Sequence, residues 1–326
     1  MPKVARVHAL IGPDGLSVDE IEVAPPGVGE VRIKVGAIGL NRADTMVMNG
    51  GFGEIPLPSK FGYEAAGTIE SVGDGVPGFV AGDRVAVLPG VQLNHGTCGE
   101  VIVCPAEMLV KTAQAQTDLE AAATWMQYLT AYAVRACRPL EKDDAVIITA
   151  ASSSVGLAAI QIVNEDGGIA IAVTRTRAKA DALRRHGAAH VIVSNEEDVA
   201  ARVQEITGGQ GAALVFDPVG GQSFLALLMS LRIGGLAVIY GGLGGDPGYF
   251  SGTLMAFRDL TIRGFATNYL VANTKQRDKA INYVRDRIEK GIFKPVIDRT
   301  FALSEIATAY RYLEGNLQVG KIVVTV

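Results

Sequence analysis

The spacing of hydrophobic and polar residues changes along this chain, and the change predicts two kinds of structure. In the first part, residues 31–35 (Val-Arg-Ile-Lys-Val) alternate apolar and polar side chains, which is the pattern of a half-buried strand. Turns rich in glycine and proline interrupt this part repeatedly, for example at residues 25–27, 73–75 and 77–78. Many short strands joined by such turns predict a barrel-like or sandwich-like β domain.

A second pattern begins near residue 117. Residues 117–120 (Thr-Asp-Leu-Glu) form a capping box, which predicts the start of a helical, alanine-rich stretch that continues to about Cys137. Helical patterns then alternate with apolar runs at residues 145–149, 169–173, 191–193, 213–216, 236–240 and 260–262. This alternation predicts an α/β domain in which crossover helices connect a six-stranded parallel sheet, as in dinucleotide-binding proteins.

The C-terminal part does not continue this alternation. An amphipathic helix is predicted from about Thr274 to Lys290, and a second from an N-cap at Ser304 to about Gly315. A terminal strand follows over residues 322–326. We therefore expect this part to rejoin the first domain, so that residues 1–125 and 268–326 form one domain and residues 126–267 are inserted as the other.

Composition and charge narrow the function. Of the 326 residues, 48% are hydrophobic and 20% charged, the balance of a chain with a substantial core. The net charge of −4 and the lack of a basic run argue against nucleic-acid binding. No signal peptide or membrane-spanning run is recognised, and three scattered cysteines suit a reducing compartment. A cytoplasmic location is expected.

The strongest local motif lies between an apolar run and a helix at residues 145–160. The turn is made of small residues, and Gly156 stands where close packing of a helix on a sheet requires glycine. Ala151 and Ser153 replace the first two glycines of a dinucleotide-binding loop, so a plain serine-capped turn is the alternative interpretation. The strand–helix alternation that follows favours pyrophosphate binding at the helix N-terminus.

The end of the second predicted strand indicates which dinucleotide is bound. Enzymes that use NAD usually place an acidic residue there, on the ribose 2′-hydroxyl. This chain instead has Thr174, Arg175, Thr176 and Lys179, with no acid before Asp181. A cationic, hydroxyl-rich segment favours the 2′-phosphate of NADPH, although a solvated basic helix start would have the same composition.

Several short motifs, in this order, resemble those of the medium-chain dehydrogenase/reductase superfamily, and most closely its zinc-free quinone oxidoreductase-like branch. The resemblance covers essentially the whole chain. It implies a GroES-like β-barrel catalytic domain formed by both chain ends, a Rossmann domain inserted between them, and a cleft between the two that holds nicotinamide and substrate. It also implies a homodimer. The motifs are residues 39–44 (GLNRAD), 62–67 (GYEAAG), 82–85 (GDRV), 129–132 (LTAY), 216–221 (FDPVGG) and 320–323 (GKIV).

The resemblance assigns cofactor contacts beyond those that the charges suggest. With Thr174 and Arg175, the predicted NADP(H)-binding residues are Asn41, Thr130, Ser152, Ser153, Ser154, Val155, Gly156, Thr176, Lys179, Ser194, Asp217, Gly241, Gly242 and Asn316.

No metal site is expected. Zinc-containing relatives have a cysteine where Asn41 stands and a histidine where Tyr63 stands, and the chain has no C-x-x-C motif. His95, Cys98 and Cys104 are close in sequence, but they lack ordinary zinc spacing and a fourth partner. Without zinc to polarise an alkoxide, the favoured acceptors are alkenes or quinones that conjugation already activates.

Asn41, Asp44 and Tyr63 are the candidate catalytic residues. The hydroxyl of Tyr63 could face substrate as a hydrogen-bond or proton donor, or it could be bonded within the core. Asp44 could instead only hold a loop. Phe52 stands near the position of the catalytic tyrosine in mitochondrial-type enoyl thioester reductases. Trp125, Met126 and Tyr128 lie on a helix that either packs in the core or borders the substrate.

The favoured function is thus the NADPH-dependent reduction of quinones, enones or 2-alkenals. One alternative is an enoyl reductase for carrier-bound or coenzyme A thioesters, which a cationic entrance would favour. Another, of a different class, is a non-catalytic NADPH-binding protein with a structural or regulatory role.

Overall fold

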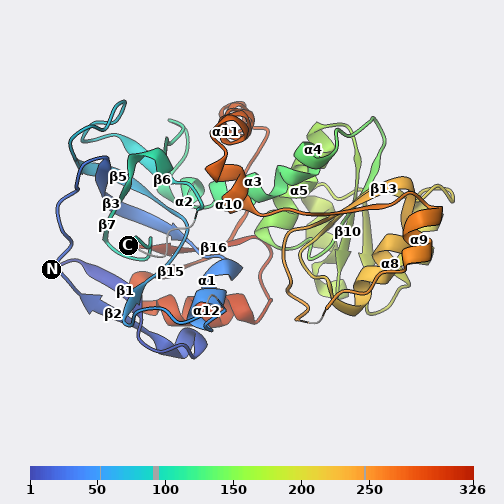
Figure 1. Cartoon of the computed structure of the whole chain (residues 1–326), viewed down its shortest axis with the longest axis horizontal. Coiled ribbons are helices and arrows are strands. Elements are labelled where there is room, and N and C mark those ends of the chain that lie inside the picture. The colour runs from blue at the N-terminus through green and yellow to red at the C-terminus, as the bar shows by residue number, and fades with distance from the viewer. Residues whose placement is uncertain (52, 91–94, 246) are drawn as a thin grey trace. The chain divides into compact units, whose positions relative to one another are not determined.

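The computed structural model describes residues 1–51, 53–90, 95–245 and 247–326, and it divides into two compact units (Figure 1). Unit 1 comprises residues 1–126, 267–289 and 294–326, and unit 2 comprises residues 127–266 and 290–293. Unit 1 thus contains both chain ends, and unit 2 is an insertion within it.

Two sheets make up the described strands of unit 1. The smaller has the order β2-β1-β4, and the larger has the order β15-β16-β3-β5-β6-β8, with β7 paired to β3. This arrangement of short strands from both chain ends agrees with the expected β domain. The bounds are β1 Lys3–Val7, β2 Leu16–Glu20, β3 Glu30–Gly39, β4 Ser59–Lys60, β5 Ala65–Val72, β6 Arg84–Val87, β7 Val101–Pro105, β8 Leu109–Lys111, β15 Ile297–Ala302 and β16 Lys321–Thr325.

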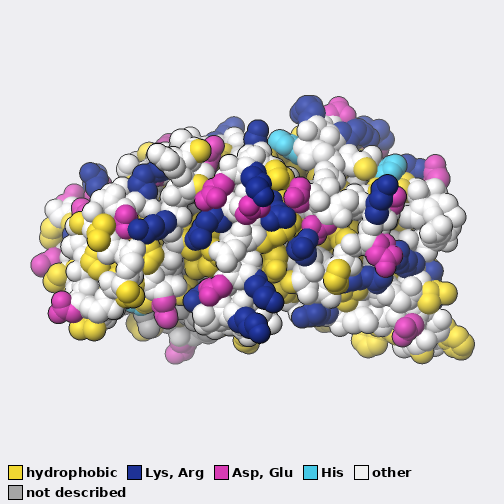
Figure 2. Space-filling model, turned by 90° about the horizontal axis from the view of Figure 1, so that it is seen from above, with side chains coloured by type: hydrophobic (Ala, Val, Ile, Leu, Met, Phe, Trp, Pro, Cys, Tyr) yellow, Lys and Arg dark blue, Asp and Glu magenta, His cyan; other side chains and the backbone are white. Residues whose placement is uncertain are grey.

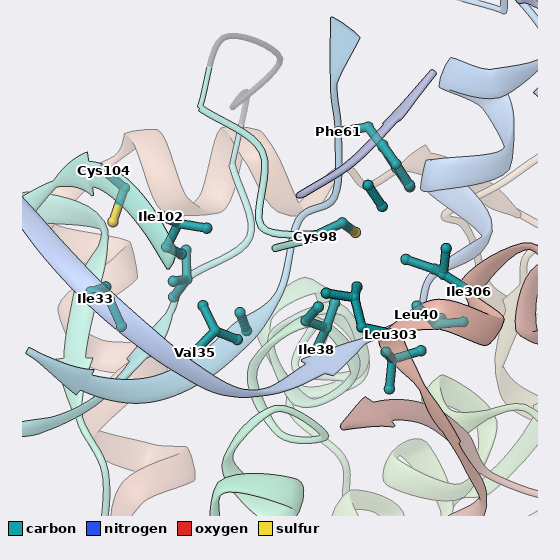
Figure 3. Close-up of a cluster of buried hydrophobic side chains, with 14 of the residues drawn as sticks. Ile33, Val35, Ile38, Leu40, Phe61, Cys98, Ile102, Cys104, Leu303 and Ile306 are labelled. Atoms are coloured by element: carbon teal, nitrogen blue, oxygen red, sulfur yellow. The ribbon is translucent and has the colours of Figure 1, made fainter. Parts of the chain in front are cut away.

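The core of unit 1 follows from the alternation along these strands. Val31, Ile33 and Val35 of β3 are buried, whereas the intervening Lys34 is exposed, as the sequence predicts. Figure 3 shows side chains of β3, β7 and the C-terminal part gathered in this core. Helix α12 (Ile306–Glu314) closes it with a stripe at helical spacing, made of Ile306, Ala309, Tyr310 and Leu313.

The remaining helices of unit 1 are short, apart from α11. They are α1 (Arg42–Met48), α2 (Asp118–Ala121), α10 (Thr267–Ala272) and α11 (Thr274–Glu289). The sequence predicted α11 with the same start and an end one residue later.

The described strands of unit 2 form one parallel sheet of six, in the order β11-β10-β9-β12-β13-β14. This confirms the predicted Rossmann sheet. The order places β9 and β12 side by side, so the chain changes its direction of travel across the sheet between them, where such folds bind ligands. The strands are β9 Ala145–Ile148, β10 Ile169–Thr174, β11 His190–Val193, β12 Ala212–Asp217, β13 Leu231–Ile239 and β14 Thr261–Gly264.

Five helices of unit 2 connect consecutive strands as crossovers. They are α5 (Ser154–Glu165), α6 (Ala180–Arg185), α7 (Val199–Ile206), α8 (Phe224–Met229) and α9 (Gly252–Phe257). Helices α3 (Trp125–Ala131) and α4 (Ala133–Cys137) precede β9.

One sequence prediction about helices was incomplete and another was wrong. The helical stretch begins after the predicted capping box at Thr117 and ends at Cys137, but it is broken into α2, α3 and α4. Between α2 and α3, the hydroxyl of Thr124 donates to the Glu120 carbonyl (2.6 Å), a bond that competes with a regular helix. Ser304 is not an N-cap, because it lies inside a 3-10 turn over Leu303–Glu305, and α12 begins only at Ile306. No helix in the described ranges is long and apolar enough to cross a bilayer.

Candidate functional site

In unit 1, the candidate residues gather where β3 runs into α1. Asn41 precedes the helix and Asp44 lies in its first turn, which brings the two side chains together. Oδ2 of Asp44 accepts hydrogen bonds from the backbone N–H of Asn41 (2.7 Å) and from the Tyr310 hydroxyl (2.9 Å). Asp44 therefore holds the entry to α1, as the loop-holding interpretation of this residue proposed.

The environment of Asp44 favours its neutral form. The side chain is fully buried, and its Oδ1 accepts no hydrogen bond from any described residue. Burial raises the pKa of Asp44 to about 7, although the hydrogen bonds from Asn41 and Tyr310 and the charge of Lys321 oppose this shift. A carboxyl group of this kind is half protonated near neutral pH.

The side-chain amide of Asn41 is held at both ends. Its Oδ1 accepts from Nζ of Lys321 (2.6 Å), and its Nδ2 donates to the Gly39 carbonyl (3.0 Å). Lys321 also donates to Oε2 of Glu64 (2.6 Å), whose Oε1 accepts the N–H of Met126 (3.0 Å). A buried polar network thus connects Asn41 to residues far away in sequence.

Sequence reasoning missed Lys321 as a site residue and assigned no role to Glu64. The available signal was a single lysine at the start of an otherwise apolar terminal strand, because a lysine is rarely buried without a partner. In the structure the Lys321 and Glu64 side chains are 1% and 0% exposed.

Gly39 makes room for this network. A Cβ at this position would lie 2.0 Å from the Ala122 carbonyl oxygen, 2.8 Å from Oε2 of Glu64 and 2.9 Å from Cε of Lys321. Only glycine therefore fits beside the ion pair.

Tyr63 lies next to the same cluster and is half-buried at the edge of the apolar core. Burial, reinforced by the nearby charge of Asp44, raises the pKa of Tyr63 to about 12. Its hydroxyl has no hydrogen-bond partner among the described residues. The group therefore keeps its proton at physiological pH and can act as a hydrogen-bond donor.

In unit 2, the small-residue turn leads from β9 directly into α5. Oγ of Ser153 accepts the N–H of Gly156 (3.0 Å) and so caps the helix. A Cβ on Gly156 would lie 2.5–2.7 Å from backbone atoms of Ala151, so the helix packs directly against the turn. Ser152, Ser154 and Val155 are partly exposed around this N-terminus. The arrangement fits a pyrophosphate, which needs close backbone approach and helix amides.

The cationic side chains after β10 differ in the partners that they contact. Arg175 is exposed and makes no ion pair or hydrogen bond with another described residue. Nζ of Lys179 donates to Oγ of Ser152 (3.2 Å), which places this charge beside the α5 turn. Arg177 is instead paired with Glu196 through Nε (3.0 Å) and Nη2. Arg175 and Lys179 therefore fit the 2′-phosphate of NADPH better than Arg177 does.

Most of the other predicted cofactor residues of unit 2 lie at the carboxyl ends of the parallel strands. Thr174 is buried at the end of β10 and Thr176 is exposed after it, whereas Ser194 follows β11 and donates its N–H to the Thr174 carbonyl (2.9 Å). Gly241 and Gly242 are exposed after β13. The parallel strand order thus places these segments, which are far apart in sequence, at the same edge of the sheet.

Three other predicted cofactor contacts are buried or hydrogen-bonded within the protein. Asp217 at the end of β12 is fully buried, and its carboxylate accepts from the Thr149 hydroxyl and from the N–H groups of Val219 (3.2 Å) and Gly220 (2.7 Å). Thr130 is buried on α3. Asn316 belongs to unit 1 and accepts a hydrogen bond from Arg42.

The helix that carries Trp125 and Tyr128 supports the core-packing interpretation. Both side chains are buried, and Tyr128 stacks on Phe293 at 5.0 Å and donates to Gln161 (2.9 Å). Phe52, which was compared with the tyrosine of enoyl thioester reductases, lies outside the described residues.

The residues once considered as zinc ligands are engaged otherwise. Nδ1 of His95 lies 3.2 Å from the Val103 carbonyl, and Cys98 and Cys104 are buried in the apolar core (Figure 3). Within the described ranges, no group of three or more His, Cys, Asp and Glu side chains could hold a metal ion.

Comparison with known proteins identifies the relatives of this chain. Residues 27–131 match the model of the alcohol dehydrogenase GroES-like domain, and residues 186–324 match that of the zinc-binding dehydrogenase family. The chain is 33% identical to a quinone oxidoreductase of Pseudomonas aeruginosa over 99% of both chains. It is 31% identical to a 2-haloacrylate reductase of a Burkholderia species, over 99% of this chain and 98% of the relative. The structure of Escherichia coli quinone oxidoreductase in complex with NADPH superimposes with a TM-score of 0.91, at 28% identity over 99% of this chain and all of the other.

Proposed function

The chain belongs to the quinone oxidoreductase-like branch of the medium-chain dehydrogenase/reductase superfamily, and on this premise we propose that it is an NADPH-dependent reductase of quinones or activated alkenes that works without zinc. The observation that carries the proposal is Arg175, which is exposed and has no ion pair or hydrogen bond among the described residues, in the same segment as Lys179 at the end of a parallel strand where an acid would select NADH. The names of the relatives, quinone oxidoreductase and 2-haloacrylate reductase, agree with it.

Unit 2 would hold the cofactor, which when bound supplies the hydride. The amides at the N-terminus of α5 would receive the pyrophosphate, and Arg175 and Lys179 would receive the 2′-phosphate. Thr176 and Ser194 lie on the same edge of the sheet and add hydroxyl donors.

Unit 1 would supply the hydrogen-bond donors for the reduction. Hydride addition to a conjugated carbonyl compound or quinone places negative charge on its oxygen, and a donor aimed at that oxygen lowers the barrier. Tyr63 is protonated at neutral pH, and burial raises its pKa further, to about 12; Nδ2 of Asn41 has a second N–H beyond the one donated to Gly39. These two groups are the candidate donors, and Asp44 positions Asn41 through its backbone.

The residue types at two positions support a zinc-independent reaction. Asn41 and Tyr63 stand where zinc-containing members of the superfamily have cysteine and histidine, and Asn41 already uses its amide oxygen to accept from Lys321. An amide and a phenol are poor zinc ligands compared with thiolate and imidazole.

A homodimer is also part of the proposal. In the described part of the chain, β14 pairs only with β13, so its other edge is open, and three of its four residues are exposed. Phe257 and Ile233 nearby are 84% and 72% exposed. Figure 2 shows hydrophobic side chains at the lower right of the view as well as elsewhere on the visible face, with positive and negative charges interspersed among them. An open edge with apolar neighbours suits pairing with a second copy.

The proposed function is tested by following NADPH oxidation with 1,4-benzoquinone, 2-cyclohexenone, a 2-alkenal, 2-chloroacrylate and an enoyl thioester, with NADH as the control. Turnover of a quinone or small alkene with a preference for NADPH is the expected result. Turnover of the thioester alone would favour the enoyl reductase function. NADPH binding without any turnover would overturn the proposal in favour of a binding protein.

A further inference from the structure

We propose that Lys321 is a positioning residue that fixes the side-chain amide of Asn41, so that this residue presents an N–H donor, and not its carbonyl oxygen, to the ligand. The inference rests on the proposed function, in which Asn41 donates to an oxygen of the substrate or cofactor. It goes further because it explains the orientation of the Asn41 amide by the buried ion pair between Lys321 and Glu64.

The chemistry of the two partners allows only one orientation of the amide. A lysine ammonium group has three donors and no acceptor, so the Asn41 atom 2.6 Å from Nζ must be the oxygen. The Gly39 carbonyl can only accept, so the atom 3.0 Å from it must be Nδ2. Both contacts agree, and they leave one N–H of Nδ2 for a ligand.

Two adjacent strands hold this geometry. Gly39 at the end of β3 pairs with Val323 of β16, and the N–H of Leu40 donates to the Ile322 carbonyl (3.1 Å). Asn41 comes directly after residues 39–40, and Lys321 comes directly before residues 322–323. These two backbone segments are hydrogen-bonded to each other. The distance between their side chains is fixed by the sheet rather than by flexible loops.

Stability alone is a poor explanation for the buried charges. The strand that follows Lys321 is apolar and buried, and an apolar pair would fill the same space without the desolvation of two ions. Glu64 neutralises Lys321 and turns its ammonium group toward Asn41, and the N–H of Met126 satisfies the other oxygen of Glu64. The ion pair adds an N–H donor of Lys321 that points at Oδ1 of Asn41.

The first test observes Asn41 directly, without cofactor or turnover. In the ¹⁵N-labelled chain, the Asn41 side-chain amide is assigned as the signal that is lost in Asn41→Ala. Lys321→Met should shift this signal and speed its exchange with water at least about tenfold, because without the charge-assisted bond to Oδ1 the amide can rotate and its Nδ2–H bond to Gly39 opens more often. An unchanged signal would overturn the proposal.

The control variant is Lys111→Met, which makes the same substitution at an exposed lysine that pairs with Asp83 at 2.9 Å. It should leave the Asn41 signal as it is. If Lys321→Met does not fold because Glu64 is left unpaired, Glu64→Gln/Lys321→Met removes both charges and should show the same change in the Asn41 signal.

The second test is a double-mutant cycle on kcat with the best acceptor. Asn41→Ala and Lys321→Met should each lower kcat about tenfold to hundredfold, since small misplacements of a catalytic group are costly. The double variant should be no slower than Asn41→Ala alone. If kcat of the double variant falls by the product of the two single fold-losses, Lys321 does not act through Asn41. If the wild type turns over nothing while the amide signal responds as expected, the proposed function fails and the positioning role stands.

Discussion

The Tyr310 hydroxyl on α12 donates a 2.9 Å hydrogen bond to Oδ2 of Asp44 on α1, although 266 residues separate the two in sequence. Both side chains are fully buried, and the ring of Tyr310 packs against Phe61 at 5.8 Å. The C-terminal helix therefore reaches the candidate site through a polar contact inside an apolar core. Any change in the charge of Asp44 acts on this contact and on the start of α1 together.

The raised pKa of Asp44 predicts that stability falls as pH rises. The folded chain holds the Asp44 proton up to a pKa of about 7, whereas the unfolded chain releases it near 3.8, so the folded state binds more protons between these values. The contribution of this group is fully present below pH 3.8 and is lost as pH rises through 7. The slope is at most about 1.4 kcal/mol per pH unit. Asp44→Asn should remove this component, as measured by urea unfolding from pH 5 to 9.

Asp83→Asn serves as the control for that measurement. Asp83 is at the surface, and its hydrogen bond from Lys111 lowers its pKa, so it stays charged over the whole range. Its replacement should leave the pH dependence between 5 and 9 as in the wild type. A wild-type chain whose stability rises steadily from pH 5 to 7, with no difference in Asp44→Asn, would show that the buried carboxyl is charged in the folded state.

Cofactor preference is predicted to depend on Arg175 and Lys179. The double change to alanine should weaken NADPH binding by roughly tenfold to hundredfold, because two charge-assisted hydrogen bonds to phosphate are lost, and should leave NADH binding nearly unchanged. Titration of each cofactor by calorimetry measures both constants. Arg177→Ala is the matched control, since Arg177 is already paired with Glu196. Equal losses for the two cofactors would disprove the assignment.

The sequence predicted the fold well because hydrophobic periodicity is a local property. All six apolar runs from residue 145 onward became strands of one parallel sheet, and α11 begins at the predicted residue. The break between α2 and α3 was not predicted; a side-chain bond from Thr124 to the Glu120 carbonyl lies there, and propensity does not reveal such a bond. The capping error at Ser304 has a similar origin, since Glu305 accepts the N–H of Ala302 and shifts the helix start.

The site was only partly predictable for a related reason. Arg175 and Arg177 are the same residue type and differ in what lies next to them, and Glu196, the partner of Arg177, is 19 residues away from it in sequence. The role of Lys321 depends on Glu64 and Asn41, which strand pairing brings to it from the other end of the chain. Composition and spacing contain no information about such partners.

Gly156 is predicted to be required for the packing of α5 on the turn before it. An alanine Cβ would lie 2.5 Å from the Ala151 carbonyl oxygen, and the backbone there cannot move without disturbing β9. Gly156→Ala should lower the free energy of unfolding by about 1–3 kcal/mol, the usual cost of overpacking, and should weaken NADPH binding. Gly252→Ala is the control, because a Cβ at Gly252 would meet nothing within 4 Å. Equal unfolding midpoints for the two variants in urea would contradict the prediction.

The open edge of unit 2 yields a prediction about assembly. If β14 pairs with a second copy, the exposed Phe257 becomes buried at the contact, and a charge in its place would have to be desolvated. Phe257→Asp should therefore weaken the dimer at least about tenfold, as measured by sedimentation velocity over a range of concentrations. Val80→Asp places the same charge at a hydrophobic position of unit 1 that is 63% exposed, and it should leave the dimer intact. A wild-type chain that sediments as a monomer, or a dimer that both variants weaken equally, would show that this edge is not where the copies meet.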